Sequence, residues 1–158
     1  MKGERILIYR GYEVRLELHR SGEDEPYQIK NARSVYEFMR GLELESAEHM
    51  YELLLDVKHR VQGVYLVGKG GIDSCHVDPI EVFKAALVTN SPAFVLVHNH
   101  PSGIVEPSLN DIDLVSRIFA GADILNLQFL DNIIIGDSRY LSFLEAGRMP
   151  VKPTKKTA

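Results

Sequence analysis

The chain has very little cysteine and no tryptophan. Of its 158 residues, Cys75 is the one cysteine. A single cysteine excludes a disulfide within the chain, and it excludes zinc sites of the kind that need several cysteines. Such sparing use of cysteine is compatible with a reducing cytoplasm.

Long hydrophobic runs are also missing. No stretch approaches the roughly 18–20 apolar residues of a membrane-spanning helix, and the N-terminus, MKGERILIYRGYEVRLE, lacks the apolar core of a signal peptide. The net charge of −4, from 18 basic and 22 acidic residues, argues against attraction of nucleic acid to the whole surface. We therefore expect a soluble, cytoplasmic protein with no membrane partner, and nucleic acid is a doubtful partner.

Strand and helix patterns alternate along the chain. Two strands are predicted near the N-terminus, at Arg5 to Arg10 and Tyr12 to His19, and Asn31 to Gly41 has the spacing of a helix that ends at Gly41. The later predicted elements are a hairpin of Met50 to Val57 and Val61 to Gly68, a helix at Pro79 to Leu87, a strand at Ala93 to His100, a helix at Ser108 to Ala122, and strands at Asn126 to Ile135 and Tyr140 to Phe143. This alternation predicts an α/β fold in which helices cover a sheet.

The two long helical patterns indicate which side chains face the sheet. The apolar positions expected to point inward are Val82, Phe83, Ala86 and Leu87 in the first helix, and Ile112, Val115, Ile118, Phe119 and Ala122 in the second.

The most informative stretch is HNHPSGIVEPSLND, at residues 98–111. His98 and His100 stand two residues apart at the end of the apolar run AFVLV, and residues i and i+2 of a strand point to the same face. Both imidazoles can therefore reach one metal ion, and Asp111 follows eleven residues later. Two histidines and one carboxylate leave a fourth position open for water, which is the arrangement of a catalytic zinc site.

Asp111 and Ser108 each have a second interpretation. The order Ser108-Leu-Asn-Asp111 before an apolar helix is a capping-box pattern, in which Ser108 caps the helix and Asp111 occupies its third position. Asp111 is therefore a helix cap, a metal ligand or both. Ser108 is either a cap or a hydroxyl that donates a hydrogen bond to a developing oxyanion.

A metal-dependent hydrolase also needs a base that accepts a proton from water. The candidates are Glu43, Glu45, Glu48 and Glu52, which lie around the start of the first predicted central strand. Each is also plausible as a solvated surface charge, and residue types alone do not choose among them. Two other features are weaker evidence for a functional site. Cys75 and His76 lie in a loop without a second cysteine, and Gly68-Lys-Gly-Gly71 lacks the spacing of a phosphate-binding loop.

Competing hydrolase and deaminase motifs are absent. The chain has no HExxH motif of helix-borne zinc proteases, and it lacks the HxE and PCxxC elements of zinc deaminases. It is also too short for the roughly 250 residues of a (β/α)8 barrel. A nuclease would need cations near the site, whereas residues 91–115 contain no Lys or Arg.

These residues resemble the JAMM (MPN+) metalloprotease motif, in which HxH is followed by seven residues beginning with Pro, then a Ser, two residues and an Asp. The wider stretches FKAALVTNSPAFVLVHNHPSG and DNIIIGD, followed by RYLSF, closely resemble the bacterial RadC-like branch of that family. The resemblance implies a three-layer α/β/α fold with a mixed central sheet, like that of cytidine deaminases. It also implies one Zn²⁺ per chain on His98, His100 and Asp111, with Ser108 near the oxyanion and Glu48 as the proton acceptor.

On this basis we expect a zinc metallopeptidase that cleaves amide or isopeptide bonds in a protein substrate. The alternative is a non-catalytic zinc-binding interaction module associated with DNA repair or mobile elements. We expect a RadC-like JAB/MPN+ domain at residues 45–147, an N-terminal extension of strands and a helix at 1–44, and a basic disordered tail at 148–158. The chain is too short for the helix-hairpin-helix DNA-binding segment that RadC-like proteins often carry, and a homodimer remains an open alternative.

Overall fold

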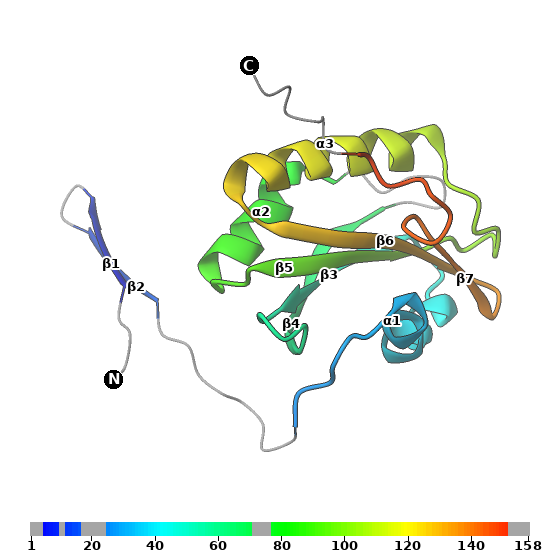
Figure 1. The fold of residues 1–158 in the computed structure, drawn as a ribbon, viewed down its shortest axis with the longest axis horizontal. Coiled ribbons are helices and arrows are strands. Elements are labelled where there is room, and N and C mark those ends of the chain that lie inside the picture. The colour runs from blue at the N-terminus through cyan, green and yellow to red at the C-terminus, as the bar shows by residue number, and fades with distance from the viewer. Residues whose placement is uncertain (1–4, 10–11, 17–24, 71–76, 152–158) are drawn as a thin grey trace.

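The protein is seen here in a computed structural model that describes residues 5–9, 12–16, 25–70 and 77–151. Its main body is one mixed sheet of five strands in the order β4-β3-β5-β6-β7 (Figure 1). Strands β5 and β6 are parallel, and the other neighbours are antiparallel. The strands are β3 (His49–Leu55), β4 (Val61–Lys69), β5 (Ala93–Asn99), β6 (Gln128–Gly136) and β7 (Arg139–Ser142).

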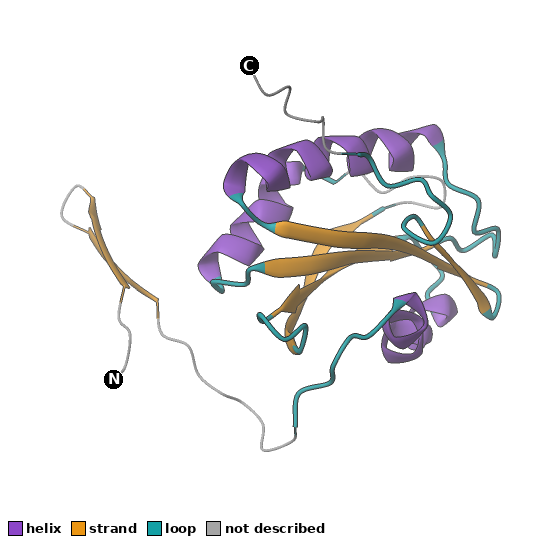
Figure 2. Cartoon of the chain, in the orientation of Figure 1, coloured by secondary structure: helices purple, strands orange, loops and turns teal. Residues whose placement is uncertain are grey.

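Helices cover both faces of this sheet, which gives three layers (Figure 2). Helices α2 (Pro79–Val88) and α3 (Leu109–Leu125) lie on one face, and α3 makes the crossover that the parallel pair β5 and β6 requires. Helix α1 (Ala32–Met39) and the short 3₁₀ helix η1 (Arg40–Leu44) lie on the other. The α/β fold with a mixed sheet, expected from the sequence, is confirmed.

The N-terminal segment contains a separate two-stranded sheet. Strands β1 (Arg5–Tyr9) and β2 (Tyr12–Leu16) pair antiparallel, with Tyr9 opposite Tyr12. Two strands were expected here, and the structure describes both; the predicted end of the second, at residues 17–19, lies outside the described residues. Residues 17–24 and 152–158 lie outside the described residues, so most of the predicted tail is untested.

Two apolar cores lie on the two faces of the sheet. Side chains of α2 and α3 pack with Phe94, Leu96 and Ile134 on one face, and side chains of α1 pack with Val95 and Ile133 on the other. Strand β5 is buried along its whole length because both of its faces are covered. Among the described helices, none is long and apolar enough to cross a membrane.

Three details of the helix predictions are wrong. Gly41 does not end the helical segment, because the 3₁₀ helix η1 continues through it. Leu87 is 51% exposed, since the inward row of α2 is Val82, Ala85 and Ala86. Ile112 is 42% exposed, because the inward position in the first turn of α3 is taken by Asp111.

Candidate metal centre

Strand β5 places the two histidines at its C-terminal end. His98 is fully buried on the α2 and α3 face, with Met50 of β3 and Ile134 of β6 as its register partners. His100 follows the strand, and its backbone N–H donates to the carbonyl of Ile135 at 2.9 Å. The two Nε2 atoms lie 3.2 Å apart, so the i, i+2 spacing has the predicted effect.

The loop after β5 is held close to the end of β6 by two glycines. Gly103 has a φ of +78°, which favours a residue without a Cβ. A Cβ on Gly136 would lie 2.9 Å from the carbonyl carbon and oxygen of Gly103. This close approach keeps the loop in place while the Ile104 carbonyl accepts a hydrogen bond from Nδ1 of His100 at 2.7 Å.

Helix α3 brings Asp111 to the histidines through a capping box. Ser108 is the N-cap: its Oγ accepts from the Asp111 N–H at 3.1 Å, and its own N–H donates to Oδ2 of Asp111 at 2.7 Å. The Ser108 hydroxyl also donates to Oδ2 at 2.7 Å. The helix-cap interpretation of both residues is therefore confirmed, and it leaves Oδ1 of Asp111 directed at His98.

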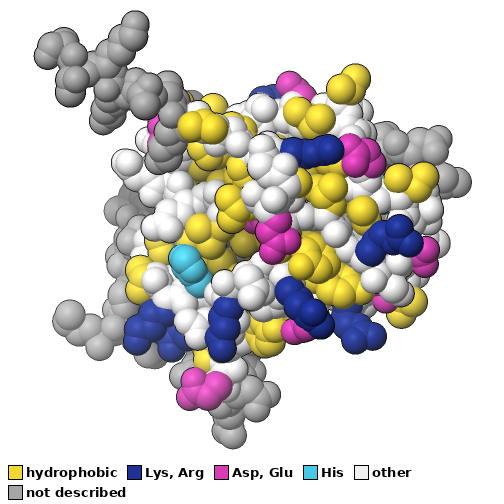
Figure 3. All heavy atoms as spheres, turned by 45° about the vertical axis from the view of Figure 1, so that its right-hand side comes forward, with side chains coloured by type: hydrophobic (Ala, Val, Ile, Leu, Met, Phe, Trp, Pro, Cys, Tyr) yellow, Lys and Arg dark blue, Asp and Glu magenta, His cyan; other side chains and the backbone are white. Residues whose placement is uncertain are grey.

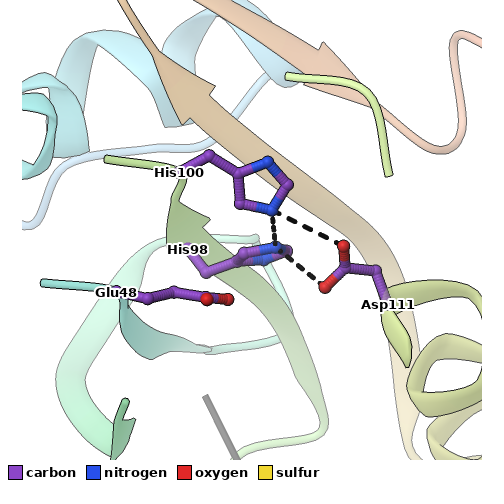
Figure 4. Close-up of side chains that lie close together, drawn as sticks. All are labelled: Glu48, His98, His100 and Asp111. Atoms are coloured by element: carbon purple, nitrogen blue, oxygen red, sulfur yellow. Dashed lines mark hydrogen bonds and ion pairs between the residues drawn. The ribbon is translucent and has the colours of Figure 1, made fainter. Parts of the chain in front are cut away.

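The spacing of these groups suits a tetrahedral ion. Nε2 of His98 lies 3.1 Å from Oδ1 of Asp111, and Nε2 of His100 lies 3.5 Å from Oδ2 (Figure 4). Ligand atoms placed 2.0–2.1 Å from a tetrahedral zinc ion would be about 3.3 Å from one another. Because the Nδ1 proton of His100 goes to the Ile104 carbonyl, its Nε2 keeps a free lone pair that faces the carboxylate. The donor set therefore fits a metal ion.

The electrostatics of the site keep Asp111 ionised. Burial acts to raise the pKa of Asp111, but hydrogen bonds with His100, His98 and Ser108 outweigh it and hold the pKa well below its usual range. Burial acts to lower the pKa of His100, whereas the Asp111 carboxylate and the Ile104 carbonyl raise it above its ordinary value. A negative charge held between two imidazoles is what a divalent cation needs.

Glu48 is the carboxylate, of the four candidates, that the fold brings to this site. Glu48, His98, His100 and Asp111 each offer one ligand atom, and these atoms lie within 4.8 Å of one another. The other three candidates lie elsewhere. Glu43 accepts a hydrogen bond from the Ser138 N–H, Glu45 is half-exposed beside His49, and Glu52 is completely buried in the core.

A family model described as the RadC-like JAB domain matches residues 29–148. The chain belongs to the RadC-like JAB domain family. The family resemblance seen in the sequence is thereby confirmed.

This RadC-like JAB domain also resembles curated proteins that share the name UPF0758. It is 43% identical over 116 residues to one from Desulfitobacterium hafniense, covering 73% of this chain and 50% of that protein. It is 36% identical over 137 residues to one from Chloroflexus aurantiacus, covering 85% and 59%. It is 37% identical over 138 residues to one from Methanococcoides burtonii, covering 86% and 60%. The chain thus spans about half of the length of the relatives it matches.

Asn99, which the sequence analysis did not single out, fixes the position of the Glu48 segment in this RadC-like JAB domain. Its side chain is buried, and its Oδ1 accepts from the His49 N–H at 2.8 Å. Its Nδ2 donates to the carbonyls of Ala47 at 3.0 Å and Glu45 at 3.3 Å. The sequence did contain a signal for this role of Asn99. A residue between two histidines that face one side of a strand must face the other side, and a buried amide there needs hydrogen-bond partners.

Replacing Asn99 with Ala should release the Glu48 segment. We expect a loss of about 1–3 kcal/mol in the free energy of unfolding, since three hydrogen bonds disappear and the buried His49 N–H loses its acceptor. Asn99→Asp keeps that acceptor but turns a carboxylate oxygen toward the carbonyls of Ala47 and Glu45, so it should lose stability too. Chemical denaturation of the two variants beside the wild type measures the difference, and equal stability of all three would contradict this role for Asn99.

A hollow lies beside the cluster in the RadC-like JAB domain. Arg117 and Asp113 form an ion pair of 3.9 Å there, so a cation does lie near the site, just beyond the stretch 91–115. The lining residues are Glu48, Met50, Val77, Asn110, Asp111, Asp113, Leu114 and Arg117. Cys75 and His76 lie outside the described residues, and their relation to this hollow is untested.

Proposed function

We propose that the chain is a zinc-dependent metallohydrolase that cleaves amide or isopeptide bonds. The observation that carries this proposal is the grouping of Glu48, His98, His100 and Asp111 within 4.8 Å, at the edge of a hollow. Three of these groups suffice to hold the ion, which leaves one carboxylate for proton transfer. A structural zinc site would instead close its fourth position with protein.

Each residue of the site has a proposed role that follows from its position. His98, His100 and Asp111 hold the ion, and a bound zinc supplies Lewis acidity, which polarises a carbonyl and makes water nucleophilic near neutral pH. Glu48 takes the proton of the attacking water and passes it to the leaving amine. Ser108 steadies the oxyanion once its hydroxyl turns from Asp111 toward the substrate, which its exposed place at the N-cap permits.

A peptide or an isopeptide-linked protein is the substrate that we propose. The hollow contains polar, acidic, basic and apolar side chains together, as a surface that receives a polypeptide would. On the face shown in Figure 3, Lys and Arg side chains lie mainly along the lower part, and acidic side chains lie among and above them. Mixed charge of this kind favours a protein over nucleic acid as the partner.

Metal content provides the first test. We expect one zinc per chain in the wild type by elemental analysis, and loss of most of it in His98→Ala and Asp111→Ala, because each change removes one of three protein ligands. The matched control is His49→Ala, since His49 is buried near the site but lies outside the cluster. Zinc retained at one per chain in His98→Ala would remove His98 from the ligand set.

Activity provides the second test of the proposal. Zinc-loaded protein should hydrolyse a fluorogenic peptide or an isopeptide-linked substrate, and addition of a chelator should stop the reaction. A single-stranded and a double-stranded DNA run in parallel should stay intact. Full zinc occupancy with no turnover of any amide substrate would favour the alternative of a non-catalytic zinc-binding module.

A further inference from the structure

Five buried side-chain polar atoms have no hydrogen-bond partner within residues 25–70 and 77–151. They are both carboxyl oxygens of Glu52, Nδ1 of His98, and the amide oxygen and nitrogen of Asn132. An unsatisfied buried polar atom costs about 1–3 kcal/mol, so native proteins contain few of them without a reason. All five belong to three residues on three adjacent strands.

The sheet register places these three residues on the same face. Glu52 of β3 is opposite Leu96 of β5, and Leu96 is opposite Asn132 of β6. Paired residues on neighbouring strands point to the same side, and Leu96 points into the core beneath α2 and α3. His98 lies two residues beyond Leu96 and faces that side too, so it is a diagonal neighbour of Glu52. Diagonal neighbours are about 7–8 Å apart at Cα, within reach of a long side chain.

The two histidines differ in the hydrogen bonding of their second ring nitrogen, Nδ1. Nδ1 of His100 has an acceptor, the Ile104 carbonyl at 2.7 Å. Nδ1 of His98 is buried and has no acceptor among the residues that the structure describes. If Nε2 of His98 gives its lone pair to a metal ion, the ring proton must sit on Nδ1, which becomes a buried donor without an acceptor. Metal-ligating histidines almost always direct this N–H to a carboxylate, a carbonyl or a water.

We propose that the Glu52 carboxyl is the acceptor for Nδ1–H of His98 in the metal-bound protein, directly or through one internal water. Glu52 is then a positioning residue that fixes the ring orientation of His98. This inference rests on the metal binding proposed above. Rotation of the Glu52 side chain toward His98 gives one of its two unpartnered oxygens a donor and gives the histidine N–H an acceptor.

Glu52 fits this role better than Asn132 does. Its side chain is one carbon longer, and a carboxyl group facing a cationic centre makes a stronger hydrogen bond than a neutral amide. An amide that accepts from His98 would still leave its own N–H donors without a partner in the core. Asn132 lies on the other side of Leu96 from Glu52, and so it provides a matched control in the same core.

Zinc affinity of three variants tests the proposal. Glu52→Leu should bind zinc about 10–100-fold more weakly than the wild type in competition with a chelator, which is the usual cost of losing a second-sphere partner. Glu52→Gln keeps a carbonyl oxygen and should recover part of the loss. Asn132→Leu should change the affinity by less than about threefold. Unfolding curves with chelator present show whether each variant is folded.

A proton NMR spectrum of the zinc-loaded protein gives a second readout. The His98 Nδ1–H should appear as a protected, downfield signal in the wild type and should shift or disappear in Glu52→Leu. Wild-type affinity in Glu52→Leu, or a larger loss in Asn132→Leu, would overturn the role of Glu52 while leaving the proposed function intact. A wild type that binds no zinc would overturn both.

Discussion

Replacing Glu48 with Gln should lower the rate of amide hydrolysis by about 10²–10⁴-fold while zinc stays at one per chain, because general-base catalysis commonly accounts for a factor of this size. Gln has nearly the same shape as Glu, but it does not accept a proton near neutral pH. His98, His100 and Asp111 are the three proposed ligands, and Glu48 is the fourth member of the cluster. Its replacement should therefore change turnover and not metal content.

The measurement is a single-turnover rate on zinc-loaded protein, with metal content determined on the same sample. Glu45→Gln is the matched control, because Glu45 is in the same segment, is half-exposed and lies outside the cluster. It should keep its rate to within a few-fold. If Glu48→Gln hydrolysed the substrate as fast as the wild type, another group would have to be the base. If Glu48→Gln lost its zinc, Glu48 would instead be a ligand.

The histidine pair could be predicted from the sequence because its geometry is local. The i, i+2 spacing in a strand is enough to put both imidazoles on one side, whatever the rest of the fold does. Asp111 was ambiguous for a related reason: Ser108 and Asp111 satisfy a capping box by themselves. The structure shows that one carboxylate serves both contacts, with Oδ2 at the cap and Oδ1 toward His98.

The carboxylate beside the histidines could not be chosen from residue types, since the choice depends on long-range pairing. Glu48 reaches the site because the segment before β3 is tied to Asn99 of β5, some fifty positions along the chain. The same register carries Glu52 into the core, four residues further on. In a sequence, an acidic residue near a strand suggests a solvated charge, and the burial of Glu52 is visible only when α2 and α3 cover the sheet.

Replacing Glu52 with Leu should stabilise the metal-free protein, and the gain should grow as the pH rises. Glu52 is completely buried, and neither of its oxygens has a hydrogen-bond partner in the described part of the chain. Burial raises the pKa of Glu52 from 4.5 to about 8. A neutral carboxyl without a partner already costs about 1–3 kcal/mol, and Leu fills a similar volume among the neighbouring Met50, Leu54 and Leu96 without that cost.

The pH dependence follows from the direction of the pKa change. Below about pH 4.5 the carboxyl is protonated in both the folded and the unfolded chain, so its ionisation does not affect stability. Between about 4.5 and 8 the unfolded chain releases the proton and the folded chain keeps it, so the wild type loses stability as the pH rises. Above about 8 the folded protein ionises too, and the accumulated loss amounts to roughly 5 kcal/mol, of the order of the whole stability of many domains.

Chemical denaturation with chelator present, at pH 5.5, 7 and 8.5, measures this difference. Glu52→Leu should exceed the wild type by about 1–3 kcal/mol or more at pH 5.5, and by several kcal/mol more at pH 8.5. Asn132→Leu controls for removal of another unpartnered polar group on the same face, and its gain should not vary with pH because an amide does not titrate in this range. A difference between Glu52→Leu and the wild type that stays constant across the three pH values would show that Glu52 does not keep its proton in the fold. If Glu52→Leu is more stable than the wild type but binds zinc more weakly, the effect of Glu52 on stability is separate from its effect on zinc binding. A residue that acted only through packing would change stability and zinc affinity in the same direction.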